Sequence, residues 1–434
     1  MRATIFTLIL LATAPASAEL VINITGGVQD ARPIAVVPFE RVDGQLDVAA
    51  VIAADLANSG RFAPMARGDM IDQPTSAEGV DYQDWRLLGV EALVVGRQVL
   101  GAGLRPAIQF RVLDVFRGTQ LVGLTVPVQD GNWRLAAHQT ADLIYETLTG
   151  DRGAFATKIA YITETGTGDA RVYSLHVSDA DGQNELAILR SPMPIMSPAW
   201  APDGRRLAYV SFQNEHAAIY IQDIYAGQQV LVSEEPGING APAFSPDGRH
   251  MALALSRGDT NLDIFVMDLS NRSLTRMTEN SAADTEPQYS PDGSWIYFTS
   301  DRGGGPQVYR IAATGGRAER VTFEGRYNAR PRISPDGRHM TMVHQFQGDY
   351  RIAVHDLQTG NVQVLTDGQL DESPSFAPNG ISVIYATQVG LRGVLASVSV
   401  DGRYAQAYAS TIDVREPVWG PYTTAPQMRL PGSE

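Results

Sequence analysis

The stretch Pro242-Ala-Phe-Ser-Pro-Asp-Gly248 decides the fold, because variants of it return at nearly constant intervals through the C-terminal two thirds of the chain. The other copies are Pro198-Ala-Trp-Ala-Pro-Asp-Gly204, Pro287-Gln-Tyr-Ser-Pro-Asp-Gly293, Pro331-Arg-Ile-Ser-Pro-Asp-Gly337, Pro374-Ser-Phe-Ala-Pro-Asn-Gly380 and the shorter Pro417-Val-Trp-Gly-Pro421. The leading prolines are 44, 45, 44, 43 and 43 residues apart. This period is typical of one four-stranded blade of a β-propeller. Six copies therefore predict six blades.

Each repeated phrase combines a short inner strand with a turn whose residues have defined roles. In the copy that begins at Pro242, the turn is Ser245-Pro-Asp-Gly248. The proline fixes φ at the first corner, Asp247 can accept backbone N–H groups, and Gly248 can adopt the positive φ that leads into the next strand. We interpret the repeated aspartates as turn formers rather than as ligands or catalysts.

The two ends of the repeat region complement each other. Residues 158–189 supply three strand patterns with no proline phrase before them, whereas residues 417–420 supply one inner strand with nothing after it. Joining the two would remove the free edges that an open fan of sheets exposes. We therefore expect an all-β six-bladed propeller over residues 155–421, closed by its C-terminal strand, and a tail over residues 422–434.

Residues 19–150 carry no repeat and predict a separate N-terminal α/β domain, so the protein is multidomain. Helical patterns cover residues 46–58, 82–88 and 133–148, and strand patterns cover residues 20–25, 33–39 and 92–99 and a hairpin of residues 107–116 and 120–128. Asn132 can cap the last helix and Gly150 can end it. The linker, residues 150–153, is short and predicts that the two domains pack together.

The N-terminus and the composition indicate an exported protein. Residues 1–18 contain Arg2, an apolar run over 5–12 and the exit Ala16-Ser17-Ala18, which together are typical of a cleaved signal peptide. The chain has no cysteine, and 34 Lys+Arg against 48 Asp+Glu give a net charge of −14. An acidic surface disfavours nucleic acid and anionic lipid. No later apolar segment is long enough for a spanning helix, so we expect no direct membrane insertion.

Motifs that would indicate catalysis or metal binding are absent from the sequence. There is no Gly-x-Ser-x-Gly and no His-Glu-x-x-His, the patterns of a propeller-capped serine hydrolase and of a zinc protease. We therefore expect no catalytic residue, no metal ligand and no cofactor.

The residues just before each proline phrase connect the outer strand of one blade to the inner strand of the next, so they converge at one mouth of the channel. This rim mixes carboxylates with small residues, which suits an inserted polypeptide segment. The alternative is a carbohydrate or small-ligand binding propeller, which would need aromatic residues exposed at the mouth. We expect the inner-strand aromatics to pack between the blades instead: Trp200, Phe244, Tyr289, Phe376 and Trp419.

Phrases in both domains resemble the TolB family of the Tol-Pal system of Gram-negative bacteria. In the first domain they are residues 32–39 and 52–62, and in the propeller they are Met196-Ser-Pro-Ala-Trp200, Asn239-Gly-Ala-Pro-Ala-Phe-Ser-Pro-Asp-Gly248, Thr285-Glu-Pro287, Phe298-Thr-Ser-Asp301, Pro306-Gln-Val-Tyr309, Leu370-Asp-Glu-Ser-Pro374 and Asn379-Gly380. The resemblance covers nearly the whole mature chain. The chain departs from the family pattern at Ile238 and at Ala329-Arg330-Pro331.

The resemblance implies a periplasmic, non-enzymatic adaptor that supports outer-membrane integrity and envelope constriction at cell division. It implies that the lipoprotein Pal and the protein TolA are binding partners, and it is compatible with other envelope proteins as further partners. Matching phrases assign the Pal face to Asn239, Gly240, Ala241, Thr285, Glu286, Asn328, Asp371 and Glu372. The TolA segment would be Glu19, Leu20, Val21, Ile22, Asn23 and Ile24, either docked as a strand or released.

Overall fold

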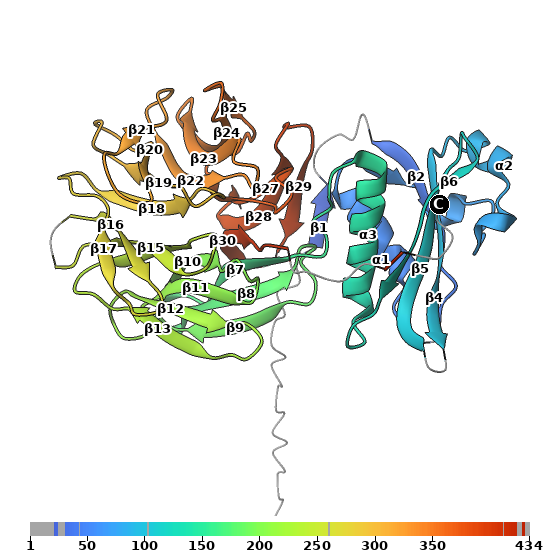
Figure 1. The fold of residues 1–434 in the computed structure, drawn as a ribbon, viewed down its shortest axis with the longest axis horizontal. Helices are drawn as coiled ribbons and strands as arrows, with labels where there is room; N and C mark the ends of the chain where they lie inside the picture. Colours follow the sequence, from blue (N-terminus) through green and yellow to red (C-terminus); the bar gives the residue numbers. More distant parts are fainter. Residues whose placement is uncertain are drawn as a thin grey trace, which may run out of the picture.

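A computed structural model describes residues 21–24, 31–42, 44–101, 104–258, 261–410, 412–422 and 428–429. The predicted signal peptide, together with Glu19 and Leu20, lies outside the described residues. Two bodies lie side by side, an α/β domain and a ring of sheets (Figure 1). Among the described residues, no helix has both the length and the hydropathy needed to cross a bilayer.

The N-terminal domain is built on one mixed sheet. Its strands run in the order β3 (Phe62–Pro64), β2 (Arg32–Val36), β4 (Ala92–Gly101), β5 (Leu104–Asp114), β6 (Thr119–Pro127) and β31 (Met428–Arg429). Strand β2 is parallel to β3 and β4, while β4, β5 and β6 are antiparallel. The predicted hairpin of two long strands is therefore confirmed. The sequence offers no signal for β31, which lies within the range expected as a tail and pairs with β6.

Helices α1 (Val48–Asn58) and α3 (Trp133–Thr149) cover the sheet face that looks toward the ring, and α2 (Tyr82–Leu87) lies on the opposite face (Figure 1). All three helices were expected from their apolar spacing. The cap of α3 is as predicted, because the Asn132 side chain accepts a hydrogen bond from Leu135 N and Gly150 ends the helix at φ 84°. The face of α3 that carries Ala137, Ala141 and Ile144 is fully buried in the core of this domain.

The ring has six blades of antiparallel strands, which confirms the predicted six-bladed propeller. Four complete blades follow one another along the chain. The strands, from the inside outward, are β10 (Ile195–Trp200), β11 (Arg206–Ser211), β12 (Ala218–Asp223) and β13 (Gln229–Ser233); β14 (Asn239–Phe244), β15 (His250–Leu255), β16 (Asp263–Asp268) and β17 (Leu274–Arg276); β18 (Asp284–Tyr289), β19 (Trp295–Ser300), β20 (Gln307–Ala312) and β21 (Glu319–Arg320); and β22 (Asn328–Ile333), β23 (His339–Phe346), β24 (Asp349–Asp356) and β25 (Val362–Val364).

The remaining two blades take strands from both ends of the chain. One consists of β30 (Asp413–Trp419), β7 (Lys158–Thr165), β8 (Val172–Asp179) and β9 (Leu186–Ser191), so the C-terminal strand closes the ring as expected. The other consists of β26 (Glu372–Phe376), β27 (Ser382–Val389), β28 (Arg392–Ser399) and β29 (Ala405–Ala409), and β1 (Val21–Ile24) adds a fifth strand at its outer edge. The strand expected near residue 20 therefore belongs to a blade and not to the sheet of the N-terminal domain.

The turns of the repeated phrase behave as the sequence predicts. In the copy that begins at Pro242, Gly248 has φ 68° and the Asp247 carboxylate accepts hydrogen bonds from Arg249 N at 3.0 Å and Ser245 Oγ at 2.6 Å. The bond from Ser245 lowers the pKa of Asp247. These turns lie at the end of the channel that faces the N-terminal domain, since Asn379 in one of them donates to Arg152 O.

The two domains are in close contact, as the short linker predicts. Gly60, just after α1, lies so near the Tyr404 ring that an added Cβ would stand 2.1 Å from it, and the glycine has φ 67°. The Tyr422 hydroxyl donates to Gly153 O at 2.8 Å, and Arg152 stacks on the Tyr422 ring. A larger residue at position 60 would therefore require the Tyr404 ring to move.

A buried cluster of charges joins the domains. His138 on α3 lies with Nδ1 2.7 Å from the Asp55 carboxylate, and its Nε2 faces Asp181 and Asp179 of the propeller at 3.9 and 4.0 Å. Burial disfavours the imidazolium, but these three carboxylates outweigh burial and raise the pKa of His138 to about 9.

The cluster is electrically balanced when His138 is protonated. Three carboxylates then face three cations, because Arg134 binds Asp181 and Lys158 binds Asp179 at 3.0 Å. Asp55, His138 and Asp181 have the donor atoms to surround a metal ion. Because Arg134 already forms an ion pair with Asp181, we interpret the cluster as an interdomain ion network and not as a metal site.

Replacing His138 tests this network through the pH dependence of stability. A raised histidine pKa contributes stability that is complete below about pH 6.5 and is lost as pH rises through about 9, on the order of 3 kcal/mol. We expect His138→Gln to remove that decline from urea unfolding curves measured between pH 6 and 9.5. The control His250→Gln, at the start of β15, should keep the wild-type decline. Equal declines in all three proteins would contradict the assignment.

Candidate functional site

Six residues with left-handed backbone conformation encircle one mouth of the channel. They stand at the same position in every blade, immediately before the leading proline: Ser197 (φ 51°), Ala241 (47°), Glu286 (55°), Arg330 (54°), Ser373 (54°) and Glu416 (48°). In each blade the pairing of the inner strand with its neighbour shifts register at this point. Each costs about 1–2 kcal/mol relative to ordinary backbone, and the bulge re-aims the side chain. We call these six residues the rim ring.

The charged members of the rim ring bind one another across blades. Arg330 Nε donates to Glu286 Oε1 at 2.8 Å, and the Arg330 guanidinium also donates to Ser373 Oγ. Glu286 Oε2 accepts from Arg330 N and from Thr299 Oγ1, at 3.0 and 2.8 Å. On the other side of the ring, Glu416 accepts from Ser197 N. Hydrogen bonds at the rim therefore link three of the six pairs of neighbouring blades.

Burial and neighbouring charges set the ionisation of the acidic and basic side chains of the rim ring. Burial raises the pKa of Glu416, with Arg330 opposing the rise. Burial alone would lower the pKa of Arg330, but Glu286, Glu416 and Glu372 outweigh it and raise that pKa above its ordinary value. Arg330 is thus held as a cation by the carboxylates around it.

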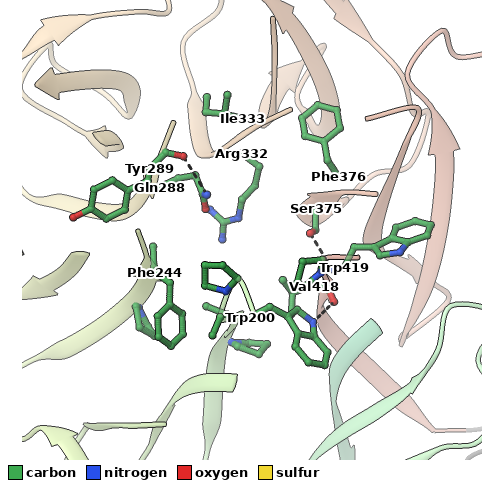
Figure 2. Close-up of a pocket in the computed structure, with 18 of the residues that line it drawn as sticks. Trp200, Phe244, Gln288, Tyr289, Arg332, Ile333, Ser375, Phe376, Val418 and Trp419 are labelled. Atoms are coloured by element: carbon green, nitrogen blue, oxygen red, sulfur yellow. Dashed lines mark hydrogen bonds between the residues drawn. The ribbon is translucent and has the colours of Figure 1, made fainter. Parts of the chain in front are cut away.

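Two residues further along each inner strand, a second ring lies deeper in the channel. Its members occupy equivalent positions in the repeated phrase: Ala199, Ala243, Gln288, Arg332, Ser375 and Val418. Figure 2 shows the Arg332 side chain extending inward between these strands. We call these residues the inner ring; both rings line a single channel of about 560 Å³.

Three of the predicted Pal-face residues are buried and bond within the loops of the rim. Asn239, Asn328 and Asp371 are at most 1% exposed. Asn239 accepts from Glu235 N at 2.9 Å, Asn328 donates to Glu324 O at 2.7 Å, and Asp371 accepts from Thr366 Oγ1 at 2.5 Å. Asp284 holds the equivalent place in its blade, with Arg302 donating to it at 2.6 Å. These side chains position the connectors and offer no surface to a partner.

The other five predicted residues lie at the mouth and are partly exposed: Gly240, Ala241, Thr285, Glu286 and Glu372. The structure thus brings all eight predicted residues to one end of the inner strands, in four neighbouring blades. This end is remote from the N-terminal domain, because each inner strand runs from the rim to the turn on the opposite side. Nothing in the described part of the N-terminal domain covers it.

Apolar side chains accompany the rim on the same connectors. Met196 is 41%, Ile238 52% and Leu370 44% exposed. They stand within three residues of the rim ring, in three different blades. Exposed apolar groups around a polar, charged centre are typical of a surface that contacts another protein.

The aromatic residues of the inner strands do not form a stacking platform. Phe244, Tyr289 and Phe376 are buried in clusters between blades, as expected. Trp200 and Trp419 are only partly buried, yet both indoles donate a hydrogen bond. Trp200 Nε1 donates to Val418 O at 3.2 Å (Figure 2), and Trp419 Nε1 donates to Thr157 Oγ1 at 2.9 Å.

The predicted TolA segment lies on a blade edge as far as it is described. Strand β1 pairs antiparallel with β29, with Val21 opposite Ala409 and Ile24 opposite Gln406. Of the two states that the sequence left open, this is the docked one.

Sequence reasoning placed Arg330 and Glu416 among the connectors but assigned them no role. Their juxtaposition comes from ring closure, which sets β30 beside β10 and places Glu416 at the same level as Arg330. One signal was available in the sequence: each stands directly before its repeat proline, at the position that Glu286 occupies in its own repeat.

Comparisons with known proteins agree over nearly the whole chain. The family described as TolB amino-terminal domain matches residues 20–121, and the TolB beta propeller domain matches residues 145–423. The Tol-Pal system proteins TolB of Xanthomonas campestris pv. campestris (strain B100) and Xanthomonas oryzae pv. oryzae (strain PXO99A) are 47% and 48% identical over 414 residues, 94% of each chain. The crystal structure of TolB from Acinetobacter baumannii is 38% identical, with a TM-score of 0.86, and covers 93% of this chain and 100% of its own.

Proposed function

Because the chain belongs to the TolB family of Tol-Pal system proteins, we propose that it is a non-enzymatic periplasmic adaptor that joins Pal to TolA. Pal binds at the channel mouth and TolA binds through the mature N-terminus. The adaptor supports outer-membrane integrity and envelope constriction at cell division. The observation that carries the proposal is the rim ring, which aims six side chains into one open mouth.

The Pal face consists of the partly exposed residues of that mouth. Gly240 and Ala241 are small enough to admit another backbone, and Glu286 and Glu372 supply negative charge. Asn239, Asn328 and Asp371 act indirectly by holding the connectors in place. Met196, Ile238 and Leu370 provide apolar contacts around the charged centre.

The engaged aromatic residues argue against a carbohydrate as the ligand. Sugar sites present aromatic faces, whereas three of the five inner-strand rings are buried between blades and both indoles donate hydrogen bonds within the propeller. The polar and apolar mixture at the rim fits a polypeptide better.

Reversing one rim charge tests Pal binding. The Glu372 side chain makes no hydrogen bond among the described residues, so Glu372→Lys alters the charge of the mouth without breaking one, and it replaces an attraction for Arg330 by a repulsion. We expect the dissociation constant for Pal, measured by calorimetry, to rise about tenfold or more, since charge complementarity is lost. The control Glu78→Lys makes the same reversal on an exposed residue of the N-terminal domain. Unchanged Pal affinity with Glu372→Lys, together with binding of glycans, would favour the carbohydrate alternative.

The N-terminal segment and the rim belong to one sheet, which gives them a physical connection. The order of strands is β1, β29, β28, β27 and β26, and β26 begins at Glu372. Pal at the rim would bias the docking of β1 if it binds the docked and released states with different affinity. TolA would then meet a docked or a released segment according to whether Pal is bound.

Hydrogen exchange measures this coupling directly. We expect amide exchange of residues 21–24 to change at least about fivefold when Pal is saturating, the lower end of typical coupling energies. Amides of β17, the outer strand of another blade, serve as the control and should not change. Identical exchange at residues 21–24 with and without Pal would contradict the coupling. The Pal face would not be affected by that result, because the charge reversal at Glu372 tests it separately.

A further inference from the structure

The inner ring contains one charged side chain among five uncharged ones. Arg332 faces Ala199, Ala243, Gln288, Ser375 and Val418 at the same level of the channel. The two alanines and the valine have short side chains, and they line the same channel as Arg332. A long cation surrounded by small neutral residues leaves room for a ligand next to it.

No acidic side chain of the described residues forms an ion pair with Arg332. Its one hydrogen bond among the described residues is from Nη1 to Pro331 O, at 2.9 Å, and no carboxylate of those residues lies within 4.0 Å of it. The guanidinium has five N–H donors. Arg330, two residues earlier on the same strand, is by contrast bound by Glu286 and Ser373. Glu286 and Ser373 therefore bind the rim arginine, whereas no acidic side chain of the described residues binds the inner one.

The surroundings of Arg332 disfavour its charge. Burial, assisted by the nearby Arg330 cation, lowers the pKa of Arg332 to about 10, although Glu286 and Glu416 oppose the change. A bound anion would supply the missing compensation. The contacts of Arg332 agree with this, since its one side-chain hydrogen bond among the described residues is to a backbone carbonyl.

We infer that the channel contains a carboxylate-binding site centred on Arg332, below the rim. A carboxylate matches the planar fork of a guanidinium and can accept two parallel hydrogen bonds from it. Glu286 and Glu416 stand between the site and solvent, so a group with one negative charge enters more readily than a multiply charged one. The carboxylate comes from an acidic side chain of the inserted Pal segment or from a small free acid; the first source rests on the proposed function.

The first arm of the test uses acetate and does not involve Pal. Thermal unfolding is compared in sodium acetate and in sodium chloride at equal ionic strength, for wild type, Arg332→Gln and the exposed control Arg317→Gln. Relative to chloride, acetate should raise the Tm of wild type and of Arg317→Gln more than it raises the Tm of Arg332→Gln. The reason is that a ligand stabilises only a protein that binds it. In chloride, Arg332→Gln should unfold no lower than wild type, since it removes an unpaired charge.

The second arm measures Pal affinity of the same proteins, and with Arg332→Lys, which keeps the charge without the fork. If Pal supplies the carboxylate, Arg332→Gln weakens Pal binding about tenfold or more, Arg332→Lys weakens it less, and acetate competes with Pal. If a free acid is the ligand, Arg332→Gln loses the Tm response to acetate but binds Pal as wild type does.

The inference is overturned if acetate shifts wild type and Arg332→Gln equally, or shifts neither, and Arg332→Gln binds Pal as wild type does. Failure of wild type to bind Pal at all would contradict the proposed function, while the acetate arm would still decide whether Arg332 binds a carboxylate.

Discussion

Pairing of β30 with β7 is the contact on which the rest of the structure depends. It joins residues more than 240 positions apart, with Val414 opposite Thr163 and Trp419 opposite Ile159. Without it, β7 would expose an unpaired edge, and β10 and β26 would lose the strand that packs between them. With it, Glu416 and Val418 complete the two rings of side chains. The closed ring is thus a condition for the site as well as for the fold.

The left-handed backbone conformation of the rim ring persists because contacts on several sides hold it in place. A proline follows each left-handed residue, and buried polar side chains such as Asn328 hold the connectors by hydrogen bonds. The Arg330–Glu286 ion pair links two neighbouring blades. Strained backbone conformations of this kind are concentrated at functional sites, where the direction of a side chain matters. The same arrangement separates two roles that the sequence could not distinguish. Asn328 is buried and positions the connector, whereas Glu286 is partly exposed and lines the channel.

The sequence predicts the repeat, the turns and the closure, because all three follow from local chemistry with a fixed period. Gly248 and Asp247 are examples, since their roles depend only on near neighbours. The sequence does not predict which rim residues are accessible, because burial of Asp371 depends on contacts with Thr366 in the folded connector. Nor does it predict that β1 docks on β29 or β31 on β6, since short edge strands carry little pattern and their partners lie in the other domain. The His138 network likewise joins three elements distant in sequence.

Removing β30 tests the account most directly. A chain ending after Ile412 lacks β30 and β31, and a chain ending after Tyr422 lacks only β31. Calorimetric unfolding should show one cooperative propeller transition for the full chain and for the chain ending at Tyr422, and a loss of that transition for the chain ending at Ile412. If the chain ending at Ile412 unfolded at the same temperature and with the same enthalpy as the chain ending at Tyr422, ring closure would not be the constraint that organises the protein.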